Sequence, residues 1–103
     1  METPIVCDLN AIPPEQRERH ASLANQIFDQ IESVTELADG FLLQLPATIW
    51  ENVAKWARLE QLCCPFFNFR LELLNGGEFR LSLTGPEGVK DLLRSELDSL
   101  DVL

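Results

Sequence analysis

The sequence has little positive charge and no long apolar run, and each shortage argues against a class of function. Its 103 residues include 8 Lys and Arg against 17 Asp and Glu, which gives a net charge of −9. Because nucleic acids and anionic membrane surfaces are bound mainly through Lys and Arg, we expect neither partner. No apolar run approaches the roughly 20 residues needed to span a bilayer. The first residues also lack the basic and apolar regions of a secretory signal, so we expect a cytoplasmic protein.

Cysteine is also scarce. Cys7, Cys63 and Cys64 are too few, and of the wrong parity, for a disulfide framework. In a reducing compartment we expect all three to be thiols. Their roles are then burial in the core, metal binding or redox chemistry. The sequence has no phosphate-binding loop, no dinucleotide fingerprint and no recognisable Ser-His-Asp arrangement, which directs attention to these cysteines.

Apolar residues are plentiful enough for one core. They make up 46% of the chain, and only five residues are glycine, which indicates a folded protein. The length fits a single domain over residues 1–103. After an extended segment over residues 1–12, Pro13 and Pro14 favour a helix start. Apolar residues then recur at three- and four-residue steps and predict a helix over residues 14–32, in which His20 begins the apolar stripe.

Glycine-containing turns divide four predicted strands into two hairpins. In the first, over residues 34–45, Asp39 and Gly40 predict a two-residue turn that sets Glu36 opposite Leu43. The second consists of two strands in which apolar and polar side chains alternate. A three-residue loop in this second hairpin places the apolar side chains of both strands on the same face, whereas a two-residue loop does not.

That loop choice pairs Leu73 with Phe79, within strands over residues 67–73 and 79–83. Between the hairpins, a helix is predicted from Thr48 or Ile49 to about Cys63. Its start has the spacing of a capping box, and the proline after the two cysteines ends it. The broad apolar face of this helix consists of Ile49, Trp50, Val53, Trp56, Ala57, Leu59, Cys63 and Cys64.

A final helix is predicted to begin at Gly85-Pro86-Glu87. Its apolar stripe consists of Val89, Leu92, Leu93, Leu97 and Leu100. The element order is therefore αββαββα, and the predicted fold class is α+β: a four-stranded antiparallel sheet with helices packed on one face. The edge strands could pair across a homodimer, an expectation from topology alone.

Glu60 gives the second helix its unusual chemistry. It falls near the middle of the apolar face, one turn before Cys63 and Cys64, where an unpaired carboxylate is costly. A bound soft ion would explain this arrangement: Cys63 and Cys64 would supply thiolates, Cys7 a third, and Glu60 or His20 an oxygen or nitrogen. Zinc, copper(I), mercury(II) and arsenic(III) suit such ligands.

Two other interpretations stay open at this point. The cysteines could simply be buried, with Glu60 paired to a core Arg or a backbone amide, in a protein whose role is to bind another protein. Alternatively, the thiols could serve redox chemistry or catalysis. A helix carboxyl end and a neighbouring carboxylate both raise a thiol's pKa, which disfavours a reactive thiolate. A disulfide between Cys63 and Cys64 is possible but would be strained. We see no set of residues that requires the protein to be an enzyme.

The stretch around the cysteines resembles a known family. Glu60-Gln61-Leu62-Cys63-Cys64-Pro65-Phe66 is similar to the Glu-x-x-Cys-Cys-Pro-Phe core of a family of small, uncharacterised bacterial proteins. The early Cys7 and the later stretch over residues 83–89 fit the same pattern. The resemblance implies a shared fold and, through an association with bacterial metal-resistance neighbourhoods, a link to metals. It implies no established activity.

Overall fold

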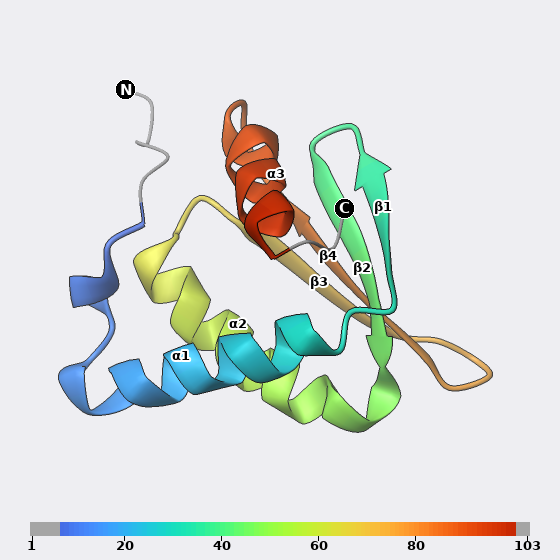
Figure 1. The fold of residues 1–103 in the computed structure, drawn as a ribbon, viewed down its shortest axis with the longest axis horizontal. Helices are drawn as coiled ribbons and strands as arrows, with labels where there is room; N and C mark the ends of the chain where they lie inside the picture. The colour runs from blue at the N-terminus through green and yellow to red at the C-terminus, as the bar shows by residue number, and fades with distance from the viewer. Residues whose placement is uncertain (1–6, 101–103) are drawn as a thin grey trace.

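The computed structural model describes residues 7–100 of the chain. Three α-helices and four strands follow one another in the order αββαββα (Figure 1). Together with two short 3-10 helices, the elements are η1 (Leu9–Ala11), α1 (Pro14–Asp29), β1 (Ser33–Leu37), β2 (Gly40–Pro46), η2 (Ala47–Ile49), α2 (Trp50–Cys63), β3 (Asn68–Leu73), β4 (Glu78–Thr84) and α3 (Val89–Ser99). The predicted α+β fold is therefore confirmed.

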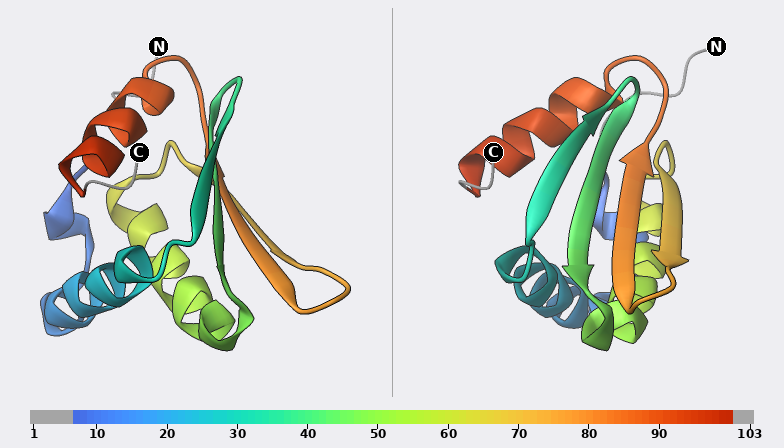
Figure 2. Two further views of the ribbon diagram at one scale, coloured as in Figure 1. Left: turned by 45° about the vertical axis from the view of Figure 1, so that its right-hand side comes forward. Right: turned by 90° about the vertical axis from the view of Figure 1, so that its right-hand side faces the viewer.

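The four strands form one antiparallel sheet in the order β1-β2-β4-β3. All three helices lie on the same side of this sheet, as Figure 2 shows. Alternate residues of the two central strands form the buried face beneath the helices: Phe41, Leu43, Leu45, Phe79, Leu81 and Leu83. The edges of the sheet are β1 and β3, so pairing across a homodimer stays a prediction.

The second hairpin has the predicted register, with Leu73 opposite Phe79. Its loop contains Gly76 and Gly77 at φ values of 93° and 84°, a conformation that residues with a Cβ rarely adopt. Leu73 is nevertheless 56% exposed, although the alternation predicts it on the buried face. The loop end of this hairpin extends away from the helices (Figure 2), which accounts for that exposure.

The predicted register of the first hairpin is wrong. The turn lies one residue earlier in the chain than the predicted turn at Asp39-Gly40. Glu36 therefore pairs with Phe41 and not with Leu43. Gly40 therefore belongs to β2, where its missing side chain matters. A Cβ at this position would lie only 1.9 Å from the backbone oxygen of Leu83 in β4. The glycine permits close strand pairing here. The sequence alone had predicted that Gly40 lies in the turn.

Two helix ends also differ from the prediction. α1 ends at Asp29, three residues early, because the backbone N–H of Glu32 donates to the oxygen of Gln44 at 2.8 Å and the chain has joined the sheet. α3 begins at Val89, after Gly88 in a left-handed conformation with φ of 98°, rather than in the Gly-Pro-Glu turn before it. Within residues 7–100, no helix combines the length and apolar character that crossing a membrane requires.

Short 3-10 helices replace predicted structure at two places. Residues 9–11 form η1 instead of an extended segment, and the Asp8 side chain accepts a hydrogen bond at its start. η2 contains Thr48, so the expected capping box with Glu51 does not form. The residue at the start of α2 is Ile49, which makes no side-chain capping bond.

Two residues of the predicted apolar faces are exposed instead of buried. Trp50 is 43% exposed and Leu100 is 44% exposed, whereas Trp56 in the middle of α2 is buried as predicted. Both exposed residues stand at the end of a helix, where fewer neighbouring elements surround a side chain. Periodicity predicts the face on which a residue lies but not how far its neighbours extend.

Glu36 attaches α3 to the edge of the sheet. Its carboxylate pairs with Arg94 and lies 3.7 Å from the ammonium of Lys90, both on α3. The hydrogen bond and the positive charge of Arg94 lower the pKa of Glu36. Arg94 also lies over the ring of Phe41, 5.5 Å from its centre. These contacts are largely exposed and add to the packing of the buried face of α3 against the sheet.

Replacing Leu43 by alanine tests the assignment of the core. Leu43 is fully buried, so we expect Leu43→Ala to lower the free energy of unfolding by about 2–5 kcal/mol. The matched control is Leu73→Ala on the exposed hairpin end, with an expected change within about 0.5 kcal/mol. Urea unfolding followed by circular dichroism measures both. Equal losses in the two variants would contradict the described hairpin orientation.

Candidate functional site

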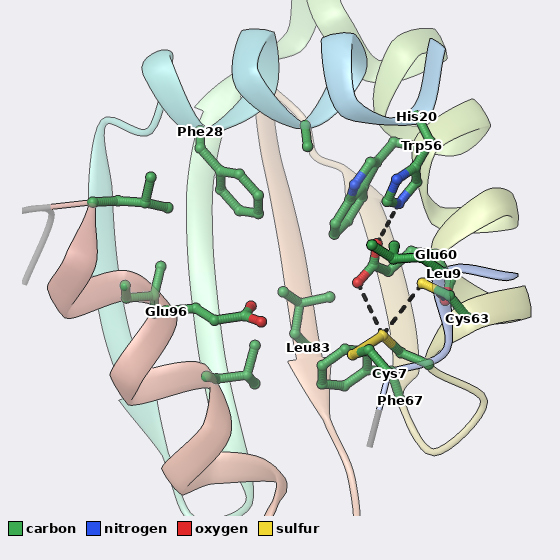
Figure 3. A pocket seen from close by; sticks show the side chains of 15 residues that line it. Cys7, Leu9, His20, Phe28, Trp56, Glu60, Cys63, Phe67, Leu83 and Glu96 are labelled. Atoms are coloured by element: carbon green, nitrogen blue, oxygen red, sulfur yellow. Dashed lines mark hydrogen bonds and ion pairs between the residues drawn. A yellow bond between two sulfur atoms is a disulfide. The ribbon is translucent and has the colours of Figure 1, made fainter. Parts of the chain in front are cut away.

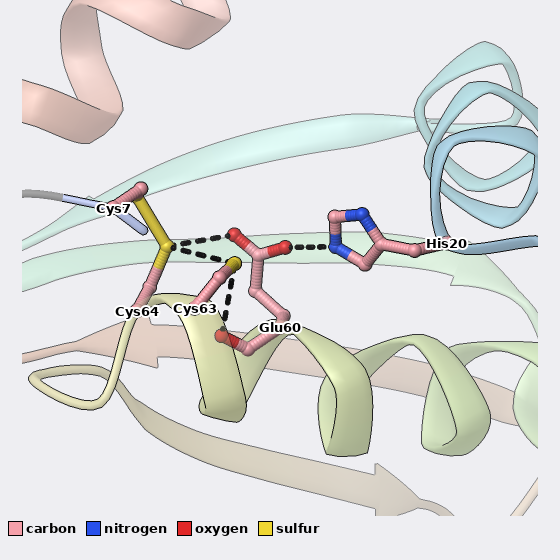
Figure 4. The surroundings of a disulfide bond; sticks show 5 residues. All are labelled: Cys7, His20, Glu60, Cys63 and Cys64. Atoms are coloured by element: carbon pink, nitrogen blue, oxygen red, sulfur yellow. Dashed lines mark hydrogen bonds and ion pairs between the residues drawn. A yellow bond between two sulfur atoms is a disulfide. The ribbon is translucent and has the colours of Figure 1, made fainter. Parts of the chain in front are cut away.

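The carboxyl end of α2 presents Glu60, Cys63 and Cys64 to one side. The backbone N–H of Cys64 donates to the oxygen of Glu60 at 2.7 Å, and Pro65 then prevents the helix from continuing. Helical spacing brings the Glu60 carboxylate within 3.2 Å of the Cys64 Sγ, while the two neighbouring Sγ atoms are 3.4 Å apart (Figure 4). The predicted grouping of the carboxylate with both sulfurs is thus present.

Cys7 reaches this group from the amino-terminal segment. The N–H of the next residue, Asp8, donates to the backbone oxygen of Cys63 at 2.8 Å and fixes the segment against the end of α2. Further along, Arg17 of α1 donates to the oxygen of Ile12 at 3.0 Å. These bonds fold the segment back along the helices, which brings sulfurs together that are 57 residues apart in the chain.

Cys7 and Cys64 form a disulfide, and Cys63 is the free cysteine. This corrects the expectation that all three are thiols. The alternative considered from the sequence, a strained bond between Cys63 and Cys64, is not the pair that forms. The two bonded residues have Cα atoms 4.7 Å apart, within the ordinary range for a disulfide. In this state Cys64 has no S–H, so its contact with Glu60 becomes a hydrogen bond only after reduction.

Cys63 is a buried thiol beside this disulfide. Burial, and after it the negative charge of Glu60, raises the pKa of Cys63 to about 12. Its Sγ also lies 3.4 Å from the backbone oxygen of Glu60, which can accept the thiol proton. The position of the thiol at a helix carboxyl end next to a carboxylate predicted a raised pKa, and the structure agrees.

The partner of Glu60 is His20 of α1. The imidazole Nε2 donates to one carboxylate oxygen at 2.6 Å, and both side chains are largely buried, with 11% and 13% of their surface exposed. The sequence suggested a core Arg, a backbone amide or a bound cation as the partner of this carboxylate. Because His20 already supplies a donor, the burial of Glu60 does not by itself require an ion.

The five candidate residues lie at the edge of a cavity of about 360 Å³ between α1, α2 and α3 (Figure 3). Most of its lining is apolar: Leu9, Ala24, Phe28, Trp56, Phe67, Leu83, Leu93, Leu97 and Leu100. The Trp56 ring packs edge-on against Phe28, with ring centres 5.6 Å apart, and its buried Nε1–H has no hydrogen-bond partner among the described residues. Opposite the sulfurs, α3 contributes Glu96.

Glu96 adds a second carboxylate to the cavity. Burial, and after it the charge of Glu60, raises the pKa of this carboxyl group. The residue as a whole is exposed, and its carboxylate points from α3 into the cavity (Figure 3). Sequence reasoning missed Glu96 because nothing in the local pattern connects it to the cysteines. Trp56 also lines the cavity. The sequence could have placed it in the candidate site, because it precedes Glu60 by one helical turn.

Two overlapping groups have donor atoms close enough to hold a metal ion. Cys7, Glu60 and Cys64 form one, and His20, Glu60 and Cys63 form the other, with the atoms of each group within 4.8 Å of one another. The structure therefore brings all five sequence-predicted residues together. Their role as ligands stays a prediction. Comparison with protein-family models, with curated proteins and with solved structures finds no match to this chain.

The raised pKa of Cys63 predicts slow alkylation of the native protein. Only the thiolate reacts, and a pKa near 12 in place of about 8.5 lowers its fraction at pH 8 roughly a thousandfold. Without reductant, iodoacetamide at pH 8 should therefore modify Cys63 at least 100 times more slowly than free cysteine, and the rate should rise with pH. Intact mass measures the modification. After unfolding in urea, one thiol per chain should react rapidly, and rapid reaction before unfolding would contradict the described environment.

The His20–Glu60 contact can be tested by unfolding. His20→Ala leaves a largely buried carboxylate without its donor, so we expect a loss of about 2–3 kcal/mol in the free energy of unfolding. Replacing both partners, as in His20→Ala with Glu60→Leu, should recover part of that loss. Breaking the exposed Arg80–Glu78 pair by Arg80→Ala is the control, with an expected change below about 1 kcal/mol. A comparable loss in the control would contradict a special role for the buried pair.

Proposed function

We propose that the reduced protein binds a soft metal or metalloid ion through Cys7, Cys63 and Cys64. The observation that carries this proposal is the convergence of all three sulfurs of the chain, from two distant segments, on the Glu60 carboxylate. Thiolates prefer zinc, copper(I) and other soft ions, among them mercury(II) and arsenic(III). Sensing, storing or transferring the ion would be the biological role.

The spacing of the sulfurs suits a shared ion. Two thiolates on a tetrahedral zinc ion, each about 2.3 Å from it, lie about 3.8 Å apart. The Sγ atoms of Cys63 and Cys64 are 3.4 Å apart, so a small movement is enough. Glu60 would supply an oxygen ligand or a charge next to the ion. His20 would hold that carboxylate from the outer side, as such partners do around metal ligands.

Reduction of the Cys7–Cys64 disulfide has to come before binding. The S–S bond takes up two electrons and two protons, which a dithiol donor supplies while it becomes a disulfide itself. The ion then displaces the thiol protons, including that of Cys63. The oxidised protein has only one free thiol and should bind soft ions poorly. The ion site is thus open only in the reduced state.

A titration tests the proposal. We expect the protein, reduced with a phosphine under anaerobic conditions, to bind one equivalent of zinc(II), mercury(II) or arsenic(III), detected by native mass spectrometry and by thiolate-to-metal absorbance. Cys63→Ser and Cys64→Ser should each weaken binding at least tenfold, because each removes a thiolate. Glu60→Gln should weaken it less, and the control Glu51→Gln, in the exposed first turn of α2, should leave it unchanged.

Two results would contradict metal binding. One is the absence of stoichiometric binding by the reduced wild-type protein. The other is binding that survives in the Cys63→Ser, Cys64→Ser double variant, since the ion would then be held elsewhere. Unchanged binding by the oxidised protein would contradict the requirement for reduction.

Thiol–disulfide exchange is the second candidate function, favoured by the disulfide beside a free cysteine. In such a reaction an external thiolate attacks Cys7 or Cys64 and releases the other sulfur as a thiolate, which takes up a proton. The raised pKa of Cys63 speaks against this residue as the attacking group. Rapid reduction of the disulfide by a small dithiol, without any ion binding afterwards, would favour exchange over metal binding.

A further inference from the structure

The cavity beside the sulfurs is larger than an ion needs. Its volume is about 360 Å³, and the sulfurs and Glu60 occupy one end of it. An apolar cavity of about 150 Å³ is large enough to hold benzene. The remaining walls come from all three helices and carry mainly aliphatic and aromatic side chains. A bare ion would leave this apolar part of the cavity unused.

The charges around the cavity restrict its ligand. Among the described residues, the lining includes the carboxyl groups of Glu60 and Glu96 but no Lys or Arg. An anionic ligand would therefore meet like charge, and His20, the basic side chain in this lining, is already paired with Glu60. A neutral or cationic group is favoured at the sulfur end. An apolar group is favoured in the rest of the cavity.

We propose that the ligand is a soft metal or metalloid centre that retains one apolar organic group, such as a monoaryl arsenic(III) or monoaryl mercury(II) species. This inference rests on the proposed ion binding. The sulfurs bind the metalloid, and the organic group lies in the cavity between Trp56 and α3. Arsenic(III) that already carries one carbon has two bonds left, and Cys7 and Cys64, the pair that forms the disulfide, supply them.

The bonding step balances without a redox partner. A hydrated aryl arsenic(III) compound carries two hydroxyl groups, and each is replaced by a cysteine sulfur. Two As–O bonds and two S–H bonds break, two As–S bonds form, and two water molecules leave with the thiol protons. In the mercury case, one Hg–S bond forms and one proton is released. The disulfide has to be reduced beforehand, as for the bare ion.

Trp56 gives the cavity a preference for an aromatic group. Its ring already takes part in edge-to-face contacts with Phe28 and Phe69, at centre distances of 5.6 and 5.9 Å. A further ring in the cavity would extend this arrangement. The aryl preference rests on these ring contacts, because a methyl group has no ring with which to extend them.

The test compares substituents on the same element. Dissociation constants of the reduced protein are measured for arsenite, a methyl arsenic(III) acid and phenylarsine oxide, with phenylmercury(II) and methylmercury(II) as a second arm. The same ligands are measured with a small free dithiol, so that the intrinsic effect of each substituent is known. After this correction, we expect phenyl compounds to bind the protein at least tenfold more tightly than methyl compounds in both arms.

A filled cavity should remove that preference. Ala24 of α1 lines the cavity, so Ala24→Leu places extra atoms in it without removing core side chains. We expect this variant to lose the phenyl preference at least tenfold while arsenite binding changes less than twofold. The matched control is Ala21→Leu, on the exposed side of the same helix, which should behave as the wild-type protein does. Circular dichroism shows whether each variant is folded. If Ala24→Leu does not fold, the comparison of phenyl with methyl compounds on the wild-type protein decides whether the inference stands.

Failure of this inference is distinguishable from failure of ion binding. If arsenite binds but phenyl and methyl compounds differ no more than they do with the free dithiol, the organic ligand is wrong and ion binding stands. A phenyl preference that is unchanged in folded Ala24→Leu would place the organic group outside the cavity and also overturn the inference. If zinc(II) binds but no arsenic or mercury compound does, the inference fails and ion binding stands. If none of these ions or compounds binds the reduced protein, the proposed function itself fails.

Discussion

The hydrogen bond from His20 to Glu60, 2.6 Å long, connects the two helices that form one side of the protein. A carboxylate on the apolar face of α2 would destabilise the fold if it had no donor. α1 must therefore pack at the distance and rotation that bring the imidazole to this oxygen. The other oxygen of the same carboxylate is left facing the sulfur of Cys64. One buried pair thus fixes the packing of α1 and the polarity of the candidate site.

The sheet supplies the second constraint, because its buried face determines where the helices can lie. The two central strands offer a continuous apolar surface, and the helices cover it from one side only. α3 packs against β2 through its buried face. The cavity lies between α3, α1 and α2 (Figure 3). Its apolar walls are therefore a consequence of core packing, while its sulfur end comes from a helix terminus.

Local patterns in the sequence predicted those features that depend on spacing within one element. The second hairpin, the end of α2 and the grouping of Glu60 with Cys63 and Cys64 follow from periodicity and turn length. The first hairpin was predicted in the wrong register because Gly40 has the same turn signature whether it lies in the turn or in the strand. Only the close approach of β4, a contact distant in sequence, distinguishes the two cases.

The partners within the site could not be predicted in the same way. Cys7 and His20 were candidates by residue type, but their contacts depend on how the amino-terminal segment and α1 pack against α2. That Cys7 bonds to Cys64, and not Cys63 to Cys64, follows from the path of residues 8–12 and from no local rule. Glu96 and the cavity depend on the angle of α3, which no pattern within α3 encodes.

The disulfide also makes part of the chain a covalent ring. The ring runs from Cys7 to Cys64 and includes α1, β1, β2 and α2, whereas β3, β4 and α3 lie outside it. Closing a loop of 57 residues restricts the unfolded chain by about 4 kcal/mol in an entropic description. An ion held by Cys7 and Cys64, as proposed, would close the same ring without a covalent S–S bond. Ion binding and folding would then be thermodynamically linked. In the reduced protein, the bound ion would restrict the unfolded chain as the disulfide does in the oxidised protein.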